Sequence, residues 1–275
     1  MRIKDLRNWG TSSLPWSGYA DDLILYLVNQ FDLQNSLNML DDIFTQFGLS
    51  INALKTESMI LNYQGKEEDY PSSLVKLKNI DIKNVKTFKY LGAFIHYKQP
   101  NTGDIEINNR IQLAVSKFAE MTNLLQNFNI ALRTRIIFLN SYVRSRLIHA
   151  CQNWNPDSNQ LARLDVTYRR FLRRMIRGGF RFIDEANNDY RCVITNDRLH
   201  EICGTEDLSN LISKQQLEYA KHVIRMPQDR SIKLLMFNDD KYTKRGRPSK
   251  TLLDQVIGHS LITLNEMCNR ALLKR

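Results

Sequence analysis

Apolar residues recur at helical spacing in three successive segments between residues 111 and 175, and this pattern constrains the fold more than any other feature. An amphipathic helix places an apolar side chain on its core-facing side every three or four residues. Gly178-Gly179 follows the third segment as a natural end. The sequence therefore predicts a mostly α-helical region from about residue 105, built on Ile111–Phe128, Leu132–Leu147 and Leu161–Met175.

The first hundred residues have the shorter pattern of strands around one helix. Predicted here are a buried strand at Leu23–Val28, a helix at Leu33–Phe47 that ends at Gly48, a hairpin from 49–52 and 58–61, a polar surface excursion at 64–84, and paired strands at 87–91 and 93–97. Further short helices are expected over 195–236, and an amphipathic helix over 251–273. The expected fold class is α+β, with a small α/β unit followed by a mostly helical one.

Charge is unevenly distributed along the chain. Residues 1–70 carry 5 basic and 10 acidic residues, whereas residues 110–191 carry 14 basic and 6 acidic ones. An acidic segment followed by a strongly basic one fits a metal-holding part next to a part that holds a polyanion. A soluble protein with uneven surface charge would give the same totals, so charge alone leaves both interpretations open.

The sequence has none of the signals of a secreted or membrane-spanning protein. No stretch approaches the ~20 apolar residues that cross a bilayer, and no apolar run follows the basic residues at the N-terminus. The four cysteines are scattered without a Cys-x-x-Cys pair, which favours a reducing intracellular compartment, the nucleus or cytoplasm. Buried free thiols are the expected state; a zinc site from Cys192, His200, Cys203 and His222 would match no common spacing.

Asp21 and Asp22 are the residues that point most clearly to chemistry. They lie in the tetrapeptide Tyr19-Ala20-Asp21-Asp22, directly before the predicted strand. Two adjacent carboxylates at such a turn are either solvated or hold a divalent cation. Nucleotidyl transfer uses carboxylates in this way, to hold two Mg²⁺ ions roughly 3.5–4 Å apart. A charged turn is the simpler alternative for the pair in isolation, and Asp41-Asp42, on the predicted helix, is expected to be an exposed helix face.

The order of motifs around Asp21-Asp22 resembles the second half of the palm of a reverse transcriptase. Downstream of the Asp pair come Gly48-Leu49-Ser50-Ile51-Asn52, Lys55-Thr56-Glu57 and Phe88-Lys89-Tyr90-Leu91-Gly92, and Arg110–Ala114 reads Arg-Ile-x-x-Ala. The residues of these motifs are similar to those of non-LTR retrotransposon (LINE-type) enzymes rather than retroviral ones. The position of Lys244–Pro248 looks most like the RTE-type branch. The resemblance covers about residues 19–255.

The resemblance implies roles for individual residues. Asp21 and Asp22 would bind Mg²⁺ or Mn²⁺ on a hairpin, with Tyr19 and Ala20 near the primer terminus and nucleotide. Lys55 would lie beside the incoming nucleotide, where it could neutralise or protonate the leaving pyrophosphate; otherwise it is a solvated turn lysine. Tyr90, Leu91 and Gly92 would form the grip that positions the primer, although Tyr90 and Leu91 are equally core candidates. The implied partners are an RNA template and a DNA primer, with no membrane.

One face of the third predicted helix carries arginines with a single interleaved acid, Asp165. A solvated helix face usually mixes charges of both signs, so this one-sign face favours contact with a phosphate backbone. In the resemblance it falls at or just past the thumb, which holds the template–primer duplex. The residues are Arg163, Arg170, Arg173, Arg174 and Arg177.

A second basic element, Lys244-Arg245-Gly246-Arg247-Pro248, contains the Arg-Gly-Arg-Pro core of the AT-hook. In that motif arginines enter narrow A·T-rich minor grooves. A basic flexible linker over 238–250 is the simpler interpretation of so short a match. Similar runs occur at this place in related elements, which favours nucleic-acid contact by Lys244, Arg245 and Arg247.

The palm implied by the resemblance is incomplete. It needs a third carboxylate from an earlier strand and the fingers that close over the nucleotide, but the only acid before Asp21 is Asp5. We therefore expect an atypical leader (1–18), a partial palm (19–100), a helical thumb-like region (101–190) and a C-terminal helical region (191–275). By descent the function would be RNA-directed DNA polymerisation, with the chain inactive alone. The alternative is a non-catalytic nucleic-acid-binding module.

Overall fold

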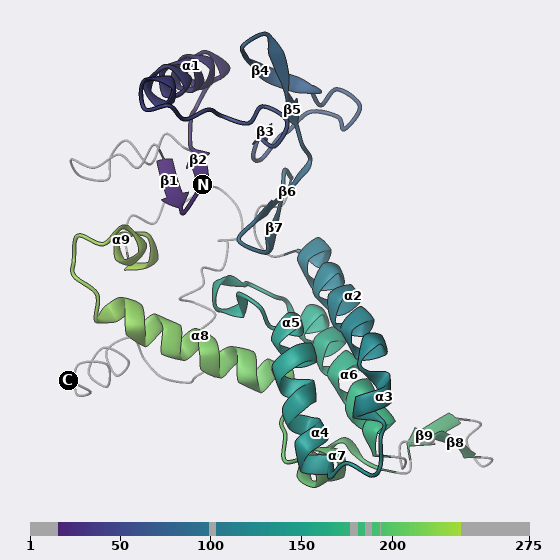
Figure 1. Ribbon diagram of the computed structural model, residues 1–275. Helices are drawn as coiled ribbons and strands as arrows, with labels where there is room; N and C mark the ends of the chain where they lie inside the picture. Colours follow the sequence, from purple (N-terminus) through teal and green to yellow (C-terminus); the bar gives the residue numbers. More distant parts are fainter. Residues whose placement is uncertain (1–15, 99–102, 177–180, 185–188, 193, 238–275) are drawn as a thin grey trace. The chain divides into compact units, whose positions relative to one another are not determined.

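The computed structural model describes residues 16–98, 103–176, 181–184, 189–192 and 194–237, the two short segments 181–184 and 189–192 by their backbone only (Figure 1). The fold is α+β, as predicted: small sheets with one helix occupy the described residues up to 98, and the residues after them are mostly helical. The described residues divide into two compact units, an N-terminal unit (16–89 and 96–98) and a helical unit (90–95 and 103–237). None of the described helices is both long and apolar enough to span a bilayer.

The N-terminal unit contains one helix and short strands. The helix α1 spans Gln30–Gln46 and, as predicted, stops at Gly48, whose φ of +71° suits glycine. The strands are β1 (Trp16–Tyr19) paired with β2 (Asp22–Leu25), and β3 (Glu57–Ser58), β4 (Ser73–Leu77) and β5 (Ile80–Asn84) in the order β3-β5-β4.

The segment 64–84, predicted as a surface excursion, instead supplies the core of this unit. Lys78 and Asn79 both have positive φ, +48° and +68°, and they join β4 to β5 in a two-residue hairpin turn. Alternation along the two strands buries Val75, Leu77 and Ile82 against Leu37 of α1. The apolar residues of these strands do alternate in the sequence. The residues between them are charged and face solvent, so the segment as a whole has the polar composition of a loop.

Three further predictions for this unit were wrong. Residues 49–52 do not form a strand, because Asn52 accepts backbone bonds from Lys55 and Thr56 and fixes a turn, after which β3 pairs with β5 in parallel. The predicted buried strand 23–28 is β2, which ends at Leu25, and Leu23 is 40% exposed because β2 pairs only with β1 among the described strands. Asp41 is buried, 2.9 Å from Lys78.

The hairpin of β6 (Thr87–Tyr90) and β7 (Ala93–His96) confirms the strand pair predicted around Gly92. Its tip, residues 90–95, belongs to the helical unit. The tip turns through Leu91 and Gly92, whose φ values are +47° and +83°. Two successive positive φ values characterise the turn that matches the twist of antiparallel strands.

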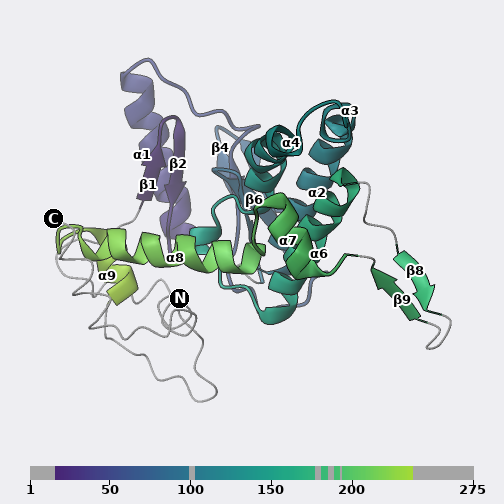
Figure 2. The same cartoon turned by 90° about the horizontal axis from the view of Figure 1, so that it is seen from below.

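The helical unit confirms the three predicted amphipathic helices (Figures 1 and 2). The first is α2 (Asp104–Glu120) with the short α3 (Thr122–Leu125). The second runs without a break through α4 (Leu132–Phe138), the π-helical turn η2 (Leu139–Arg144) and α5 (Ser145–Leu147). The third is α6 (Ser158–Met175). Their apolar faces meet in one core that includes Phe118, Leu139 and Tyr168.

The remaining described elements follow this core. They are the 3-10 turn η3 (Cys151–Asn153), the hairpin β8 (Arg181–Asp184) and β9 (Asp189–Cys192), and the helices α7 (Asn196–Cys203), α8 (Leu208–Ile224) and α9 (Ser231–Phe237). The helix α8, longer than the short helices predicted there, packs against α6 and η3. Buried Asp165 of α6 accepts a bond from the Ser209 amide in the first turn of α8. Asp165 is therefore a structural acid rather than part of a solvated face.

Candidate nucleic-acid interface

Asp21 and Asp22 lie at the tip of a tight antiparallel hairpin. Tyr19 pairs with Asp22, so the loop between the strands contains only Ala20 and Asp21. Ala20 has a φ of +53°, a region that a residue with a Cβ seldom occupies and that is found preferentially at functional sites. The hairpin therefore holds two adjacent carboxylates at its end, in a backbone conformation that this alanine adopts at a cost.

Both carboxylates are exposed, and neither has a hydrogen bond or ion pair within the described part of the chain. An aspartate pair in this state can coordinate a hard divalent cation through oxygen while water fills the other positions. The described residues bring no third His, Cys, Asp or Glu into a group with them. The hairpin can thus contribute part of a metal site.

The other predicted residues of the N-terminal unit are also accessible. Tyr19 is 63% exposed. Lys55 is exposed in a turn that the Asn52 side chain fixes by accepting bonds from the Leu54 and Lys55 amides at 3.1 and 3.2 Å. No contact joins Lys55 to Asp21 or Asp22 among the described residues. Lys55 is therefore presented on an ordered turn but is not brought to the carboxylates.

The Tyr90–Gly92 tip is anchored to α2 by a buried ion pair. Arg110 and Glu106, both almost fully buried, lie 2.6 Å apart. Arg110 also donates to the Gly92 carbonyl oxygen, and Glu106 accepts from the Phe94 amide at 2.9 Å. Arg110, the first residue of the Arg-Ile-x-x-Ala run, thus fixes this tip to α2 within the helical unit.

Exposure at the tip separates the two core candidates. Tyr90 is half-buried, but Leu91 is 47% exposed, so the expectation of a core position fails for Leu91. Its positive φ turns the side chain out at the hairpin end. The tip is therefore fixed to α2 at Gly92 and Phe94 and accessible at Leu91.

The arginines of α6 are only partly available to a ligand. Arg163 pairs with Asp104 at 2.7 Å, and Arg173 donates to the Asn196 side chain at 2.7 Å. Arg170 is exposed, and Arg174 is exposed with its guanidinium 5.5 Å from the Phe118 ring centroid. The one-sign face was partly misinterpreted, because partners distant in sequence neutralise or bind two of its members. Arg177 lies outside the described residues.

Two other sequence hypotheses concern the basic element at 244–248 and the cysteine–histidine zinc site. Lys244, Arg245 and Arg247 lie outside the described residues. Cys203 is a buried free thiol whose pKa burial raises to about 11, and the described residues bring no three His, Cys, Asp or Glu side chains together as a metal site. His200 instead contacts Thr205 and Asp207, at 3.0 and 2.9 Å.

Sequence analysis missed the exposed arginines of the α4–η2–α5 helix. Residues 121–156 contain four arginines and no acidic residue. Arg135 is buried and binds the carbonyl oxygens of Leu125, Ile130 and Met175, whereas Arg133 and Arg146 are exposed. The acid-free stretch was the available signal, and it was overlooked because the apolar period of the helix was used only to predict packing.

Comparison of the chain with protein-family models, with curated proteins and with solved structures gives no match.

Proposed function

We propose that this chain is part of a LINE-type reverse transcriptase, an RNA-directed DNA polymerase, in which Asp21 and Asp22 bind catalytic Mg²⁺ or Mn²⁺. One observation carries the proposal: the two aspartates stand exposed and adjacent at the tip of a two-residue hairpin turn. The two-residue turn, with Ala20 at a φ of +53°, keeps both carboxylates together at the hairpin end, where they are accessible to a divalent cation.

The remaining residues fit supporting roles in nucleotidyl transfer. Metal ions held by carboxylates activate the primer hydroxyl and stabilise the leaving pyrophosphate. Lys55 would lie near that pyrophosphate, and the Tyr90–Gly92 tip would contact the primer backbone. Arg170 and Arg174 are the accessible members of the α6 face for contact with the duplex. Phosphate contacts of this kind hold a duplex without reading its sequence.

A metal-binding measurement tests whether the exposed Asp21-Asp22 pair can hold a cation. We expect the chain to bind Mn²⁺ weakly, with a dissociation constant that rises by roughly tenfold or more in Asp21→Asn and in Asp22→Asn, because each change removes a charged ligand. The measurement is electron paramagnetic resonance of free Mn²⁺ during titration. Asp42→Asn is the matched control, an exposed aspartate of α1 that should leave binding unchanged. Equal Mn²⁺ affinity in all four proteins would contradict the proposal.

The alternative is a non-catalytic nucleic-acid-binding module, and the lack of a third metal ligand among the described residues favours it. Without a complete metal site and a pocket that aligns the nucleotide, positioning worth ~7–11 kcal/mol is lost. We therefore expect no primer extension by the isolated chain on an RNA template with Mg²⁺ or Mn²⁺. Extension by the native chain that disappears in both Asp21→Asn and Asp22→Asn would show that the chain completes the site itself, and would reject the alternative.

A further inference from the structure

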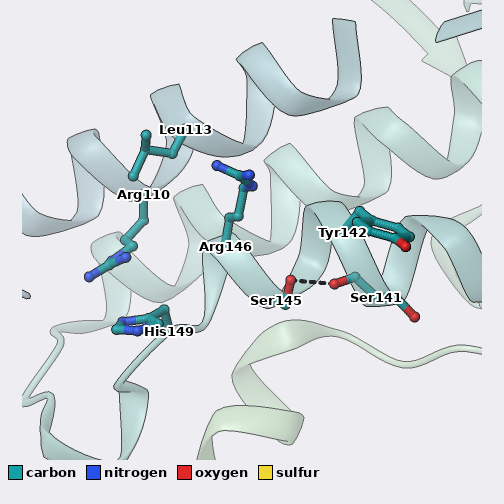
Figure 3. A pocket seen from close by; sticks show the side chains of 7 residues that line it. All are labelled: Arg110, Leu113, Ser141, Tyr142, Ser145, Arg146 and His149. Carbon is teal, nitrogen blue, oxygen red and sulfur yellow. Dashed lines mark hydrogen bonds between the residues drawn. The ribbon is translucent and has the colours of Figure 1, made fainter. Parts of the chain in front are cut away.

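A pocket of about 390 Å³ opens on the helical unit between α2 and the α4–η2–α5 helix (Figure 3). Its polar lining comes from Arg110 of α2 and from Ser141, Ser145, Arg146 and His149. In Figure 3 Arg110 and His149 lie beside one another, while Arg146 extends from its helix toward α2. The pocket is thus lined by two guanidinium groups, an imidazole and hydroxyl groups, from α2 and from residues 141–149.

The charge of this pocket is positive. Arg110 is neutralised by Glu106, but Arg146 is exposed and makes no ion pair within the described residues. Glu120, an acid influenced by the charge of Arg146, is already paired with Lys117 at 2.7 Å. No other acid lies nearby in sequence, since residues 121–156 contain none. Arg146 thus offers a fixed fork of N–H donors to an anion.

The backbone on the α5 side of the pocket is irregular. The π-helical turn η2 ends at Arg144, immediately before α5. Within this stretch the Ser145 hydroxyl donates to the Ser141 carbonyl oxygen at 2.6 Å, the bond drawn in Figure 3. Single π-helical turns are rare and occur frequently at functional sites. The turn supports a binding role for this face but does not identify the ligand.

The Tyr90–Gly92 tip lies against two of the residues that line the pocket, His149 and Arg110. A Cβ added to Gly92 would lie 3.0 Å from Cε1 of His149, and the Gly92 carbonyl oxygen accepts from Arg110. Glycine suits position 92, because φ there is +83° and a Cβ would approach the imidazole closely. A ligand held by His149 and Arg146 would therefore lie next to the Tyr90–Gly92 tip.

We propose that this pocket binds one phosphate of a nucleic-acid backbone, with Arg146 as the principal binding residue and His149 beside it. The volume is near the lower end for small-molecule pockets, and the charged group is exposed, so a phosphodiester that continues out of the pocket on both sides suits it better than an enclosed metabolite. The assignment rests on the proposed function, because the neighbouring tip is the predicted primer grip. The phosphate would belong to the primer strand.

The test uses a 20-base-pair RNA–DNA template–primer in fluorescence anisotropy across a salt series. Arg146→Ala should weaken binding roughly three- to tenfold and lower the log–log salt slope by about 0.9, the value for one phosphate contact. Arg133→Ala removes an exposed arginine of α4 outside the pocket and should have a smaller effect. A set of primers, each with one uncharged methylphosphonate linkage, maps the contact. At one or two adjacent linkages the substitution should weaken duplex binding by the native chain but leave binding by Arg146→Ala unchanged.

The outcomes separate this inference from the proposed function. Two results would overturn the pocket and leave the proposed function standing, provided that the native chain binds the duplex. One is a loss of affinity in Arg146→Ala no larger than that in Arg133→Ala. The other is a methylphosphonate effect on the native chain that is the same at every linkage. Absence of any duplex binding by the native chain would overturn both. Inorganic phosphate is the second arm: if it binds the native chain but not Arg146→Ala, while both proteins bind duplex equally, the pocket takes a free anion and the backbone assignment is wrong.

Discussion

Arg110→Ala should lower the free energy of unfolding of the helical unit by about 3–5 kcal/mol, the range for breaking a buried ion pair. The change leaves the Glu106 carboxylate, 3% exposed, without its counter-charge. It also removes the donor to the Gly92 carbonyl oxygen and so releases the hairpin tip. The measurement is urea unfolding followed by far-ultraviolet circular dichroism, which reports mainly on the helices.

Two comparisons distinguish this mechanism from a general loss of charge. Arg163→Ala breaks the solvent-exposed pair with Asp104 and should cost less than about 1 kcal/mol. The double variant Arg110→Met, Glu106→Gln keeps an acceptor for the Phe94 amide and leaves no unpaired carboxylate, so it should recover part of the loss. A cost below 1 kcal/mol for Arg110→Ala would show that the pair does not anchor the hairpin.

The helical unit was the most predictable part of the fold. Its core residues recur at intervals that only a helix brings to one face, and Phe118, Leu139 and Tyr168 are buried as that period requires. The hairpin at Leu91–Gly92 could also be predicted, because glycine at a break between two apolar runs marks a turn with positive φ. In both cases the deciding interactions are close in sequence.

Predictions failed where contacts distant in sequence decide. Asp41 is buried, and its ion-pair partner Lys78 lies in the β4–β5 turn, distant in sequence. Arg163 is held by Asp104 of another helix, which no pattern within α6 could indicate. The strands of 64–84 are too short and too charged for composition to separate them from a loop. Local periodicity predicts elements, whereas ion pairs between elements must be observed.

The same limit applies to the candidate site. The sequence pattern singled out Asp21, Asp22, Lys55 and the Tyr90–Gly92 tip. The structure places Asp21, Asp22 and Lys55 exposed on ordered turns, and the tip is exposed at Leu91. The sequence pattern could not indicate that Arg110 holds the Gly92 carbonyl oxygen, or that His149 packs against Gly92. Those contacts join the hairpin tip to α2 and to the turn after α5, and they depend on how α2 and α5 pack together.

Polarity of the nucleic-acid overhang distinguishes a polymerase fragment from a general nucleic-acid binder. A polymerase site engages a recessed primer 3′-end, and metal at Asp21 and Asp22 would contact that end. A general binder responds only to the number of phosphates. Two duplexes of identical length, one with a 5′ template overhang and one with a 3′ overhang of the same size, carry equal charge and differ only in the end that they present.

The central measurement is therefore the affinity of the native chain for these two duplexes, by fluorescence anisotropy in Mg²⁺ and in EDTA. We predict dissociation constants of roughly 1–100 µM at physiological salt, the range for sequence-independent binding. We also predict tighter binding of the recessed 3′-end in Mg²⁺, with the preference lost in EDTA and in both Asp21→Asn and Asp22→Asn but kept in Asp42→Asn. Equal affinity for the two duplexes in Mg²⁺, unchanged by the aspartate substitutions, would contradict the assignment of the hairpin as a polymerase metal site.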